Sequence, residues 1–195
     1  MTIIRTVVPP VFKLTVERYH QMIDRGVLTE DDDVELIEGV LLTKFRKSAA
    51  HDLVLEHLNP ILCRTVPGDL IARCQLAVTF GESEPEPDIS ICEPARNRGG
   101  RKPAAADTFV VMEVADTSLA YDRTDKLRVY AAAGIPVYWV VNLVDRQVEV
   151  SVDPVTPAGG LPHYRTRTLY SPGESVPLVI RGQQVGTVAV SGFLP

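Results

Sequence analysis

Glu113 is the first residue whose position suggests chemistry. It interrupts the segment 109–115 (FVVMEVA), in which both faces of the expected strand are otherwise apolar. A strand that is apolar on both faces belongs at the buried centre of a sheet. A lone carboxylate there is costly unless it is paired, protonated or bound to a metal ion. Glu113 is therefore a candidate functional residue, with a buried salt bridge or a strand-end carboxylate as the alternatives.

A second carboxylate, Asp88, opens the short apolar segment 89–92 and follows Pro87. Proline fixes the approach of the backbone, and alone a Pro–Asp pair is an ordinary turn. If the strands that carry Asp88 and Glu113 are neighbours, however, their carboxylates can hold a divalent cation. The backbone carbonyl of Val114 can complete the coordination.

Lys126 lies on a predicted helix over 122–133, in which positions 122, 126 and 130 share one face. An exposed Asp122–Lys126 pair is one interpretation. If the helix packs across the end of the Glu113 strand, the ammonium group can instead orient a water and stabilise charge on a phosphate.

Glu38 ends the first strand of a predicted hairpin and precedes Gly39. It is either a turn carboxylate or a further metal ligand or water contact. Two carboxylates and a lysine suffice for metal-assisted hydrolysis of a phosphodiester, because the metal lowers the pKa of water and neutralises the transition state.

These residues need a scaffold of alternating helices and strands. Helices are predicted over 15–24, 49–65 and 122–133, and strands over 34–38, 40–42, 70–80, 89–92, 108–115, 135–143 and 147–152, followed by short closing strands. This order predicts one α/β domain over 1–195, with a central mixed sheet flanked by helices and an extended lead-in over 1–12.

Three local features of this scaffold are also predicted. Pro60 should kink or split the second helix, whose buried side is expected to include Leu53 and His57. The segment 94–106, rich in Arg, Gly, Pro and Ala, is expected to be a mobile loop. Trp139 is expected in the core.

Composition and net charge bear on whether the protein binds or acts on nucleic acid. The 195 residues are 45% hydrophobic and 23% charged, with a net charge of −5. A generic nucleic-acid coat protein would be basic, but carboxylates that hold metal ions also count as negative, so an enzyme acting on nucleic acid is not excluded.

Membrane insertion and metal binding through cysteine are not expected. No apolar run approaches the roughly 20 residues of a membrane helix, and the start MTIIRTVVPP is too short and proline-rich for a signal peptide, which favours the cytoplasm. Cys63, Cys74 and Cys92 form no C-x-x-C pair, so we expect buried, reduced cysteines.

Basic and histidine side chains offer further candidates. Two clusters can follow a DNA backbone, with a solvated loop as the alternative for each: Arg96, Arg98, Arg101 and Lys102, and also Lys44, Arg46 and Lys47. His51 and His57 are six residues apart and do not share a helix face as metal ligands would. Both are interpreted as structural, although His51 can still approach the site from near Ser48.

The order of these motifs resembles the Uma-two family, a bacterial family of predicted restriction endonucleases in the PD-(D/E)xK nuclease superfamily. The resemblance covers roughly 12–193. It rests on VELIEG (34–39), EPEPD (84–88), VMEVADTSLAYD (111–122), Lys126, YA (130–131), AGIP (133–136) and YW (138–139).

The resemblance implies a restriction-endonuclease-like fold and Mg²⁺- or Mn²⁺-dependent phosphodiesterase chemistry. Asp88 matches the Asp of the PD motif, Glu113 the acidic residue of the next strand, Glu38 the N-terminal acidic position, and Gln75 a polar position of the preceding strand. The usual lysine two residues after the acidic position is absent, because residue 115 is Ala. Lys126, on the following helix, matches the family's alternative lysine.

The sequence therefore predicts a Mg²⁺- or Mn²⁺-dependent DNA endonuclease, expected as a homodimer because nucleases of this class often cut two strands as dimers. Asp88 and Glu113 would hold the metal, Lys126 would orient water or stabilise the transition state, and Glu38 would assist. The alternative is a nuclease fold that has lost cleavage and binds nucleic acid as an accessory module. A glycosidase-type carboxylate pair is disfavoured, because the chain has only six Tyr and one Trp for a sugar platform.

Overall fold

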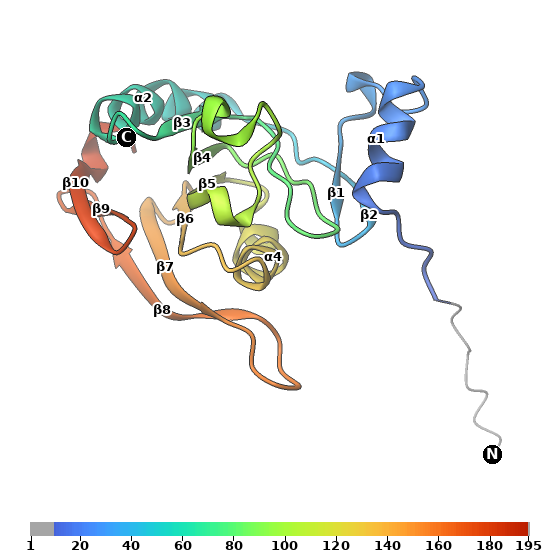
Figure 1. The fold of residues 1–195 in the computed structure, drawn as a ribbon. Helices are drawn as coiled ribbons and strands as arrows, with labels where there is room; N and C mark the ends of the chain where they lie inside the picture. Colours follow the sequence, from blue (N-terminus) through green and yellow to red (C-terminus); the bar gives the residue numbers. More distant parts are fainter. Residues whose placement is uncertain (1–9, 195) are drawn as a thin grey trace, which may run out of the picture.

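The computed structural model describes residues 10–194 and centres on a six-stranded mixed sheet, shown in Figure 1. The strand order is β3-β4-β5-β6-β7-β8, which confirms the predicted α/β class with a central mixed sheet. Only β5 and β6 pair in parallel; the other neighbours are antiparallel. The strands are β3 (Ile71–Cys74), β4 (Ile89–Cys92), β5 (Thr108–Ala115), β6 (Val137–Asn142), β7 (Gln147–Val155) and β8 (His163–Tyr170).

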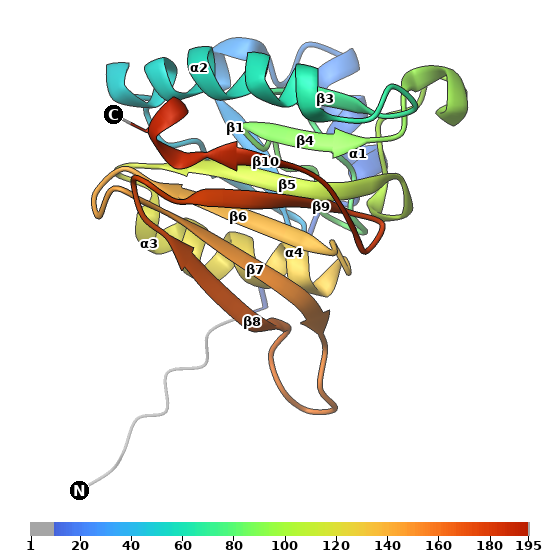
Figure 2. The same cartoon turned by 90° about the vertical axis from the view of Figure 1, so that its left-hand side faces the viewer.

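Helices and a second hairpin cover the two faces of this sheet (Figure 2). One face packs against α2 (Ala49–Thr65) and the hairpin β9 (Ser175–Ile180)–β10 (Gln183–Ala189). The other face packs against the crossover between β5 and β6. This crossover consists of α3 (Leu119–Tyr121), the π-helical turn η4 (Asp122–Lys126) and α4 (Leu127–Ala132).

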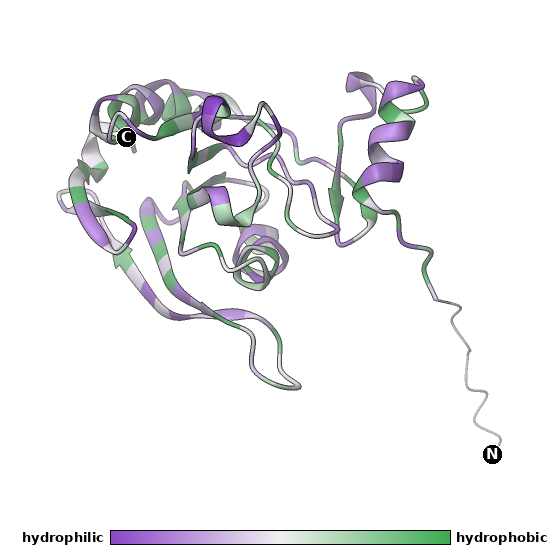
Figure 3. Ribbon diagram, in the orientation of Figure 1, coloured by the Kyte–Doolittle hydropathy of each residue, from purple (hydrophilic) through white to green (hydrophobic). Residues whose placement is uncertain are grey.

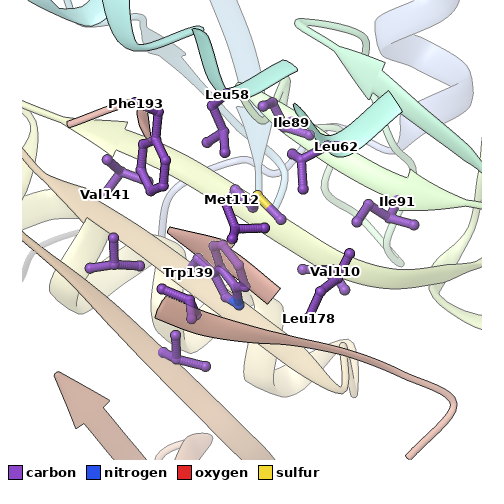
Figure 4. Close-up of a cluster of buried hydrophobic side chains, with 14 of the residues drawn as sticks. Leu58, Leu62, Ile89, Ile91, Val110, Met112, Trp139, Val141, Leu178 and Phe193 are labelled. Atoms are coloured by element: carbon purple, nitrogen blue, oxygen red, sulfur yellow. The ribbon is translucent and has the colours of Figure 1, made fainter. Parts of the chain in front are cut away.

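The alternation of side chains along β5 decides which layer Glu113 faces. Val110, Met112 and Val114 point to the α2 side, where they join Trp139 in the larger core (Figure 4). Val111 and Ala115 point to the opposite side. Because successive side chains of a strand alternate between faces, Glu113 points with Val111 and Ala115 toward α4.

A smaller N-terminal unit lies beside this body (Figure 1). It contains α1 (Val16–Asp24), η1 (Glu30–Asp32) and the hairpin β1 (Val34–Ile37)–β2 (Val40–Thr43). The helix is largely hydrophilic (Figure 3), but Val16 and Tyr19 are buried against Leu36 of the hairpin. The unit joins the body through backbone bonds such as Glu84 N–H to the Leu36 carbonyl (2.7 Å).

Most predicted elements are confirmed, including 15–24, the hairpin, 49–65, 89–92 and 108–115, and Trp139 is buried. The strand predicted over 70–80 is too long, because Gln75 has a positive φ of 50° and ends the extended run at Cys74. The helix predicted over 122–133 begins at Leu119. The segment 94–106 contains two short 3₁₀ turns, η2 (Ala95–Arg98) and η3 (Ala105–Asp107).

Pro60 does not split α2, which runs without a break from Ala49 to Thr65. Proline has no N–H, so the carbonyl of Glu56, four residues earlier, receives no hydrogen bond within the helix. Pro60 and Glu56 are both exposed, so water can bond to that carbonyl instead. Buried Leu58 and Leu62 hold the helix on either side.

Two expectations about burial are wrong. Leu53 and His57 are exposed, and Val54, Leu55 and Leu58 take the buried side of α2. The cysteines carry no disulfide in the described part of the chain, but only Cys92 is buried, whereas Cys63 is exposed. Within residues 10–194, no helix is both long and apolar enough to cross a membrane. Most of the extended lead-in, residues 1–9, lies outside the described residues.

A buried carboxylate, Glu84, links the N-terminal unit to the body. Its side chain accepts hydrogen bonds from His20 of α1 (2.9 Å), Lys102 (2.5 Å) and Thr79 (2.9 Å). Burial raises the pKa of Glu84, but the hydrogen bonds from Lys102 and His20 outweigh it and hold that pKa below its ordinary value. Glu84 therefore stabilises the fold as an ionised carboxylate.

We predict that Glu84→Gln lowers the free energy of unfolding at neutral pH by about 1–3 kcal/mol. Because the folded pKa lies below the unfolded one, this contribution is complete above the unfolded pKa and is lost as the pH falls below about 4. Urea midpoints of both proteins from pH 8 to pH 3 test this. A difference that stays constant down to pH 3 would contradict it.

The hairpin turn at Glu38–Gly39 depends on glycine for two reasons. Glu38 and Gly39 have φ values of 49° and 79°, as a two-residue hairpin turn requires. A Cβ at Gly39 would also lie 2.8 Å from the Lys13 Cβ and 2.9 Å from the Leu14 carbonyl oxygen.

We predict that Gly39→Ala destabilises the protein more than Gly134→Ala does. Gly134 has a similar φ of 74° but no atom within 4 Å of a built Cβ, so it isolates the conformational cost of about 1–2 kcal/mol. Gly39→Ala adds the clash with backbone. Urea unfolding followed by Trp139 fluorescence measures both, and equal losses would show that the close approach at Gly39 relaxes freely.

Candidate active site

One cavity gathers the predicted catalytic residues. It is lined by residues of the hairpin β1–β2 and the segment after it, the first turn of α2, the adjoining ends of β4 and β5, and the crossover from α3 to η4. Asp88, Glu113 and Lys126 all line it. The structure thus brings together the three side chains to which the sequence assigned catalytic roles, and those roles stay a prediction.

Asp88 and Glu113 lie on neighbouring strands, as expected. The register of β4 and β5 pairs Ile89 with Met112 and so places Asp88 beside Glu113. The Asp88 N–H donates to Glu113 Oε2 (3.3 Å), and the Val114 N–H donates to Asp88 Oδ2 (2.8 Å). Both carboxylates are buried, with 7% and 5% of the residue exposed.

Lys126 reaches this pair from the crossover helix. Its Nζ donates to Glu35 Oε2 at 2.8 Å and to Glu113 Oε1 at 3.3 Å. Tyr130, one turn later, donates its hydroxyl proton to the same Glu113 oxygen at 2.5 Å. The alternative of an exposed Asp122–Lys126 pair is wrong, because both residues are buried.

The π-helical turn explains how Asp122, Lys126 and Tyr130 all face the site. In an α-helix, four residues overshoot a full turn by about 40°, so two such steps would rotate the face by about 80°. The turn over 122–126 is wider, with i→i+5 bonding. With more residues in each turn, the four residues from Asp122 to Lys126 rotate through less than 360°. This shortfall offsets the excess rotation between Lys126 and Tyr130 in α4. The three side chains therefore stay nearly in line.

Glu35, which was not predicted from the sequence, contacts Lys126, whereas the predicted Glu38 lies outside the cavity lining. Glu35 is 6% exposed and lines the cavity. Glu38 does not line it; its carboxylate forms a two-pronged ion pair with Arg128, with Arg128 Nη2 to Oε2 at 2.7 Å. Glu35 shares a strand face with Ile37, whereas Glu38 belongs to the turn itself, but strand alternation alone does not show that this face meets Lys126.

His51 approaches the site, as the sequence left open. Its Nε2 lies 2.9 Å from Asp88 Oδ1 and its Nδ1 lies 3.1 Å from Asp52 Oδ1. Ser48 begins α2 by accepting a hydrogen bond from the His51 N–H (3.2 Å), and both residues line the cavity. The packing of this helix end against Asp88 could not be derived from the sequence. Gln75 does not line the cavity; its N–H donates to the Asp88 carbonyl (2.9 Å).

The site concentrates negative charge in a buried place. Four buried carboxylates, those of Glu35, Asp88, Glu113 and Asp122, line the same cavity as Lys126. Burial, with the charge of Asp88, raises the pKa of Glu113 above its ordinary value, although Lys126 opposes the shift. Burial also raises the pKa of Asp122 to about 6.

Lys126 keeps its charge in this setting. Burial alone would lower its pKa, but Glu113 and Glu35 hold that pKa above its usual range. Lys126 is therefore a cation and hydrogen-bond donor at neutral pH.

These residues suit a magnesium ion that keeps some of its waters better than a metal ion whose ligands all come from the protein. Among residues 10–194, no three His, Cys, Asp or Glu side chains converge to hold a metal. Mg²⁺ usually keeps several waters and takes one or two carboxylates, with substrate phosphate completing the shell. Asp88, Glu113 and the Val114 carbonyl match that donor set, and the excess of buried carboxylates supplies the charge that a divalent cation would neutralise.

The two predicted basic clusters differ in position. Arg98 is buried and donates Nε–H to the Glu93 carbonyl (2.9 Å), which makes it unavailable to a DNA backbone. Arg101 pairs with Asp107, and Lys102 with Glu84, whereas Arg96 is exposed. Lys44, Arg46 and Lys47, in contrast, line the cavity itself.

Comparisons with known proteins agree with this geometry. A crystal structure described as a "putative nuclease belonging to DUF820 from Anabaena variabilis ATCC 29413" matches with a TM-score of 0.69 and 15% sequence identity, over 93% of this chain and 97% of that chain. At this identity the match shows the fold, and the predicted restriction-endonuclease-like architecture is confirmed. No curated protein matches the chain. The family model Uma2, described as "Putative restriction endonuclease", matches residues 16–189, so the chain belongs to the Uma2 (Uma-two) family that its motifs predicted.

Proposed function

We propose that this protein is a Mg²⁺- or Mn²⁺-dependent DNA endonuclease that hydrolyses phosphodiester bonds. One observation carries the proposal: Asp88, Glu113 and Lys126, from two strands and a helix, meet in a single buried cavity. Membership of a family described as restriction endonucleases supports the reaction class.

The metal would be held by Asp88, Glu113 and the Val114 carbonyl. When bound, it supplies Lewis-acid activation of a water and of the scissile phosphate. His51 and the Val114 N–H fix one oxygen each of Asp88 (2.9 and 2.8 Å), while Tyr130 and Lys126 fix Glu113 Oε1. Ligands whose other contacts are fixed in this way bind a metal in a defined orientation.

Lys126 would stabilise the charge that develops on the phosphate. A cation held in a buried, preorganised position is worth more there than in water, because no reorganisation is needed during the reaction. Glu35 holds Lys126 through the 2.8 Å bond between its Oε2 and the Lys126 Nζ. The hairpin β1–β2 therefore acts on the chemistry by positioning the lysine. The homodimer expected from the resemblance stays a prediction.

We predict that Asp88→Asn and Lys126→Met each lower metal-dependent cleavage by about 100-fold or more, because the first removes the charge that holds the metal and the second removes the cation at the reacting phosphate. Nicking of supercoiled plasmid in Mg²⁺, Mn²⁺ or EDTA measures the effect. Asp69→Asn is the matched control, because Asp69 is exposed, pairs with Arg181 and does not line the cavity. Circular dichroism checks that each variant is folded.

Cleavage that persists in EDTA, or in both site variants, would contradict the proposed site. Absence of cleavage by the unmodified protein in either metal would favour the accessory-module alternative, in which the fold binds nucleic acid without cutting it.

A second pair of variants tests which of the two glutamates, Glu35 or Glu38, supports the site. We predict that Glu35→Gln lowers the cleavage rate by about 10-fold or more, because Lys126 loses its closest carboxylate. Glu38→Gln, which loses only the pair with Arg128, should cleave at the unmodified rate. The same plasmid assay compares the two variants. A larger loss of cleavage in Glu38→Gln would support the assisting role that the sequence predicts for Glu38.

A further inference from the structure

An exposed aromatic side chain stands at the mouth of the cavity. Phe45 is 47% exposed and lines the cavity together with Tyr121. The two ring centroids are 5.5 Å apart and the rings are inclined by 37°. Single exposed apolar residues are common on protein surfaces; the informative feature is the position of this one beside a cluster of buried charges.

The aromatic pair adjoins the catalytic lysine. Lys126 Nζ lies 6.0 Å from the centroid of the Tyr121 ring, so Tyr121 separates Phe45 from the reacting centre. The Tyr121 hydroxyl oxygen is itself buried and has no hydrogen-bond partner among the described residues. Buried hydroxyls rarely lack a partner, which indicates that a water or ligand atom completes this corner of the cavity.

Positive charge follows Phe45 directly. Arg46 and Lys47 are exposed, line the cavity and form no ion pair in the part of the chain that the structure describes. By comparison, Lys44 lies 2.7 Å from Glu86, and Lys102 lies 2.5 Å from Glu84. The charges of Arg46 and Lys47 are thus free to contact phosphates.

The opposite side of Lys44 is unsuitable for a polyanion. A second hollow there is lined by Glu30, Asp33 and Glu86. Like charges would repel phosphate from that direction. The backbone of a bound strand is therefore expected to leave the cavity over Arg46 and Lys47, past the face of Phe45.

We infer that the site takes an unpaired nucleotide, whose base stacks on Phe45 while its neighbouring phosphates contact Arg46 and Lys47. In a duplex, bases are turned inward and offer no face to Phe45, whereas a single strand or a flap offers both a base face and phosphates. Stacking on an aromatic ring beside a basic track is how proteins hold single strands without reading their sequence. The inference rests on the proposed function, since it assigns that site a single-stranded DNA substrate.

The test measures binding separately from cleavage. A fluorescently labelled single strand and its perfect duplex are titrated with the full chain in Ca²⁺, and fluorescence anisotropy gives each Kd. We expect the single strand to bind more tightly, and Phe45→Ala to weaken that binding by about tenfold without changing the duplex. Phe45→Trp, which keeps a stacking face, should restore single-strand binding.

A matched control and a spectroscopic readout separate stacking from general surface effects. Phe12→Ala is the control, because Phe12 is 71% exposed and does not line the cavity. In a strand that carries 2-aminopurine, stacking quenches the fluorescence, and this quenching should disappear in Phe45→Ala only.

Two results would overturn the inference: a duplex that binds at least as tightly as the single strand, or a Phe45→Ala variant that retains both affinity and quenching. The proposed function fails separately. A protein that cuts neither substrate in Mg²⁺ or Mn²⁺ but shows Phe45-dependent single-strand preference would keep the inference and lose the endonuclease. Duplex cleavage that is unaffected by Phe45→Ala would support the endonuclease and contradict the single-strand inference.

Discussion

The buried ammonium group of Lys126 is the interaction on which the rest of the site depends. Its contacts to Glu35 at 2.8 Å and Glu113 at 3.3 Å join the N-terminal hairpin, the central sheet and the crossover helix at one atom. Without it, two buried carboxylates would have no positive partner, and breaking such a buried pair is strongly destabilising. The same cation that makes the carboxylates tolerable to the fold is the one proposed to act on the phosphate.

Three ordinary features of secondary structure bring these groups together. The alternation of β5 turns Glu113 away from the larger core and toward α4. The π-helical turn keeps Lys126 and Tyr130 in line above it. The tight turn at Glu38–Gly39 sets the hairpin so that Glu35 faces inward and Glu38 faces Arg128. Each feature is local, yet all three converge on the oxygens of Glu113 or on the lysine beside it.

Sequence reasoning found the site residues that break a local rule. Glu113 was recognisable because a charge in an apolar strand needs an explanation, and Asp88 and Lys126 gained weight only in combination with it. Glu35 and His51 break no such rule. A glutamate in an exposed-looking hairpin strand and a histidine at a helix start are unremarkable until the hairpin and α2 are packed against β4 and β5. The boundary at Gln75 was missed, and a split at Pro60 does not occur, for a related reason: a positive φ and the exposure of the Glu56 carbonyl are decided by surroundings that the sequence does not state.

The acidic net charge of −5 is consistent with a nucleic-acid substrate once charges are sorted by their place in the fold. Glu35, Asp88, Glu113 and Asp122 are buried around Lys126, where a divalent cation would compensate them, and Glu84 and Glu149 are buried among basic partners. What a polyanion meets at the mouth of the cavity is instead the exposed pair Arg46 and Lys47. Total charge therefore says little about the partner of this protein, because only charges that are unpaired and near the point of entry guide a phosphate. A chain that is acidic overall can present a locally positive entrance and still keep, behind it, the carboxylates that its proposed chemistry requires.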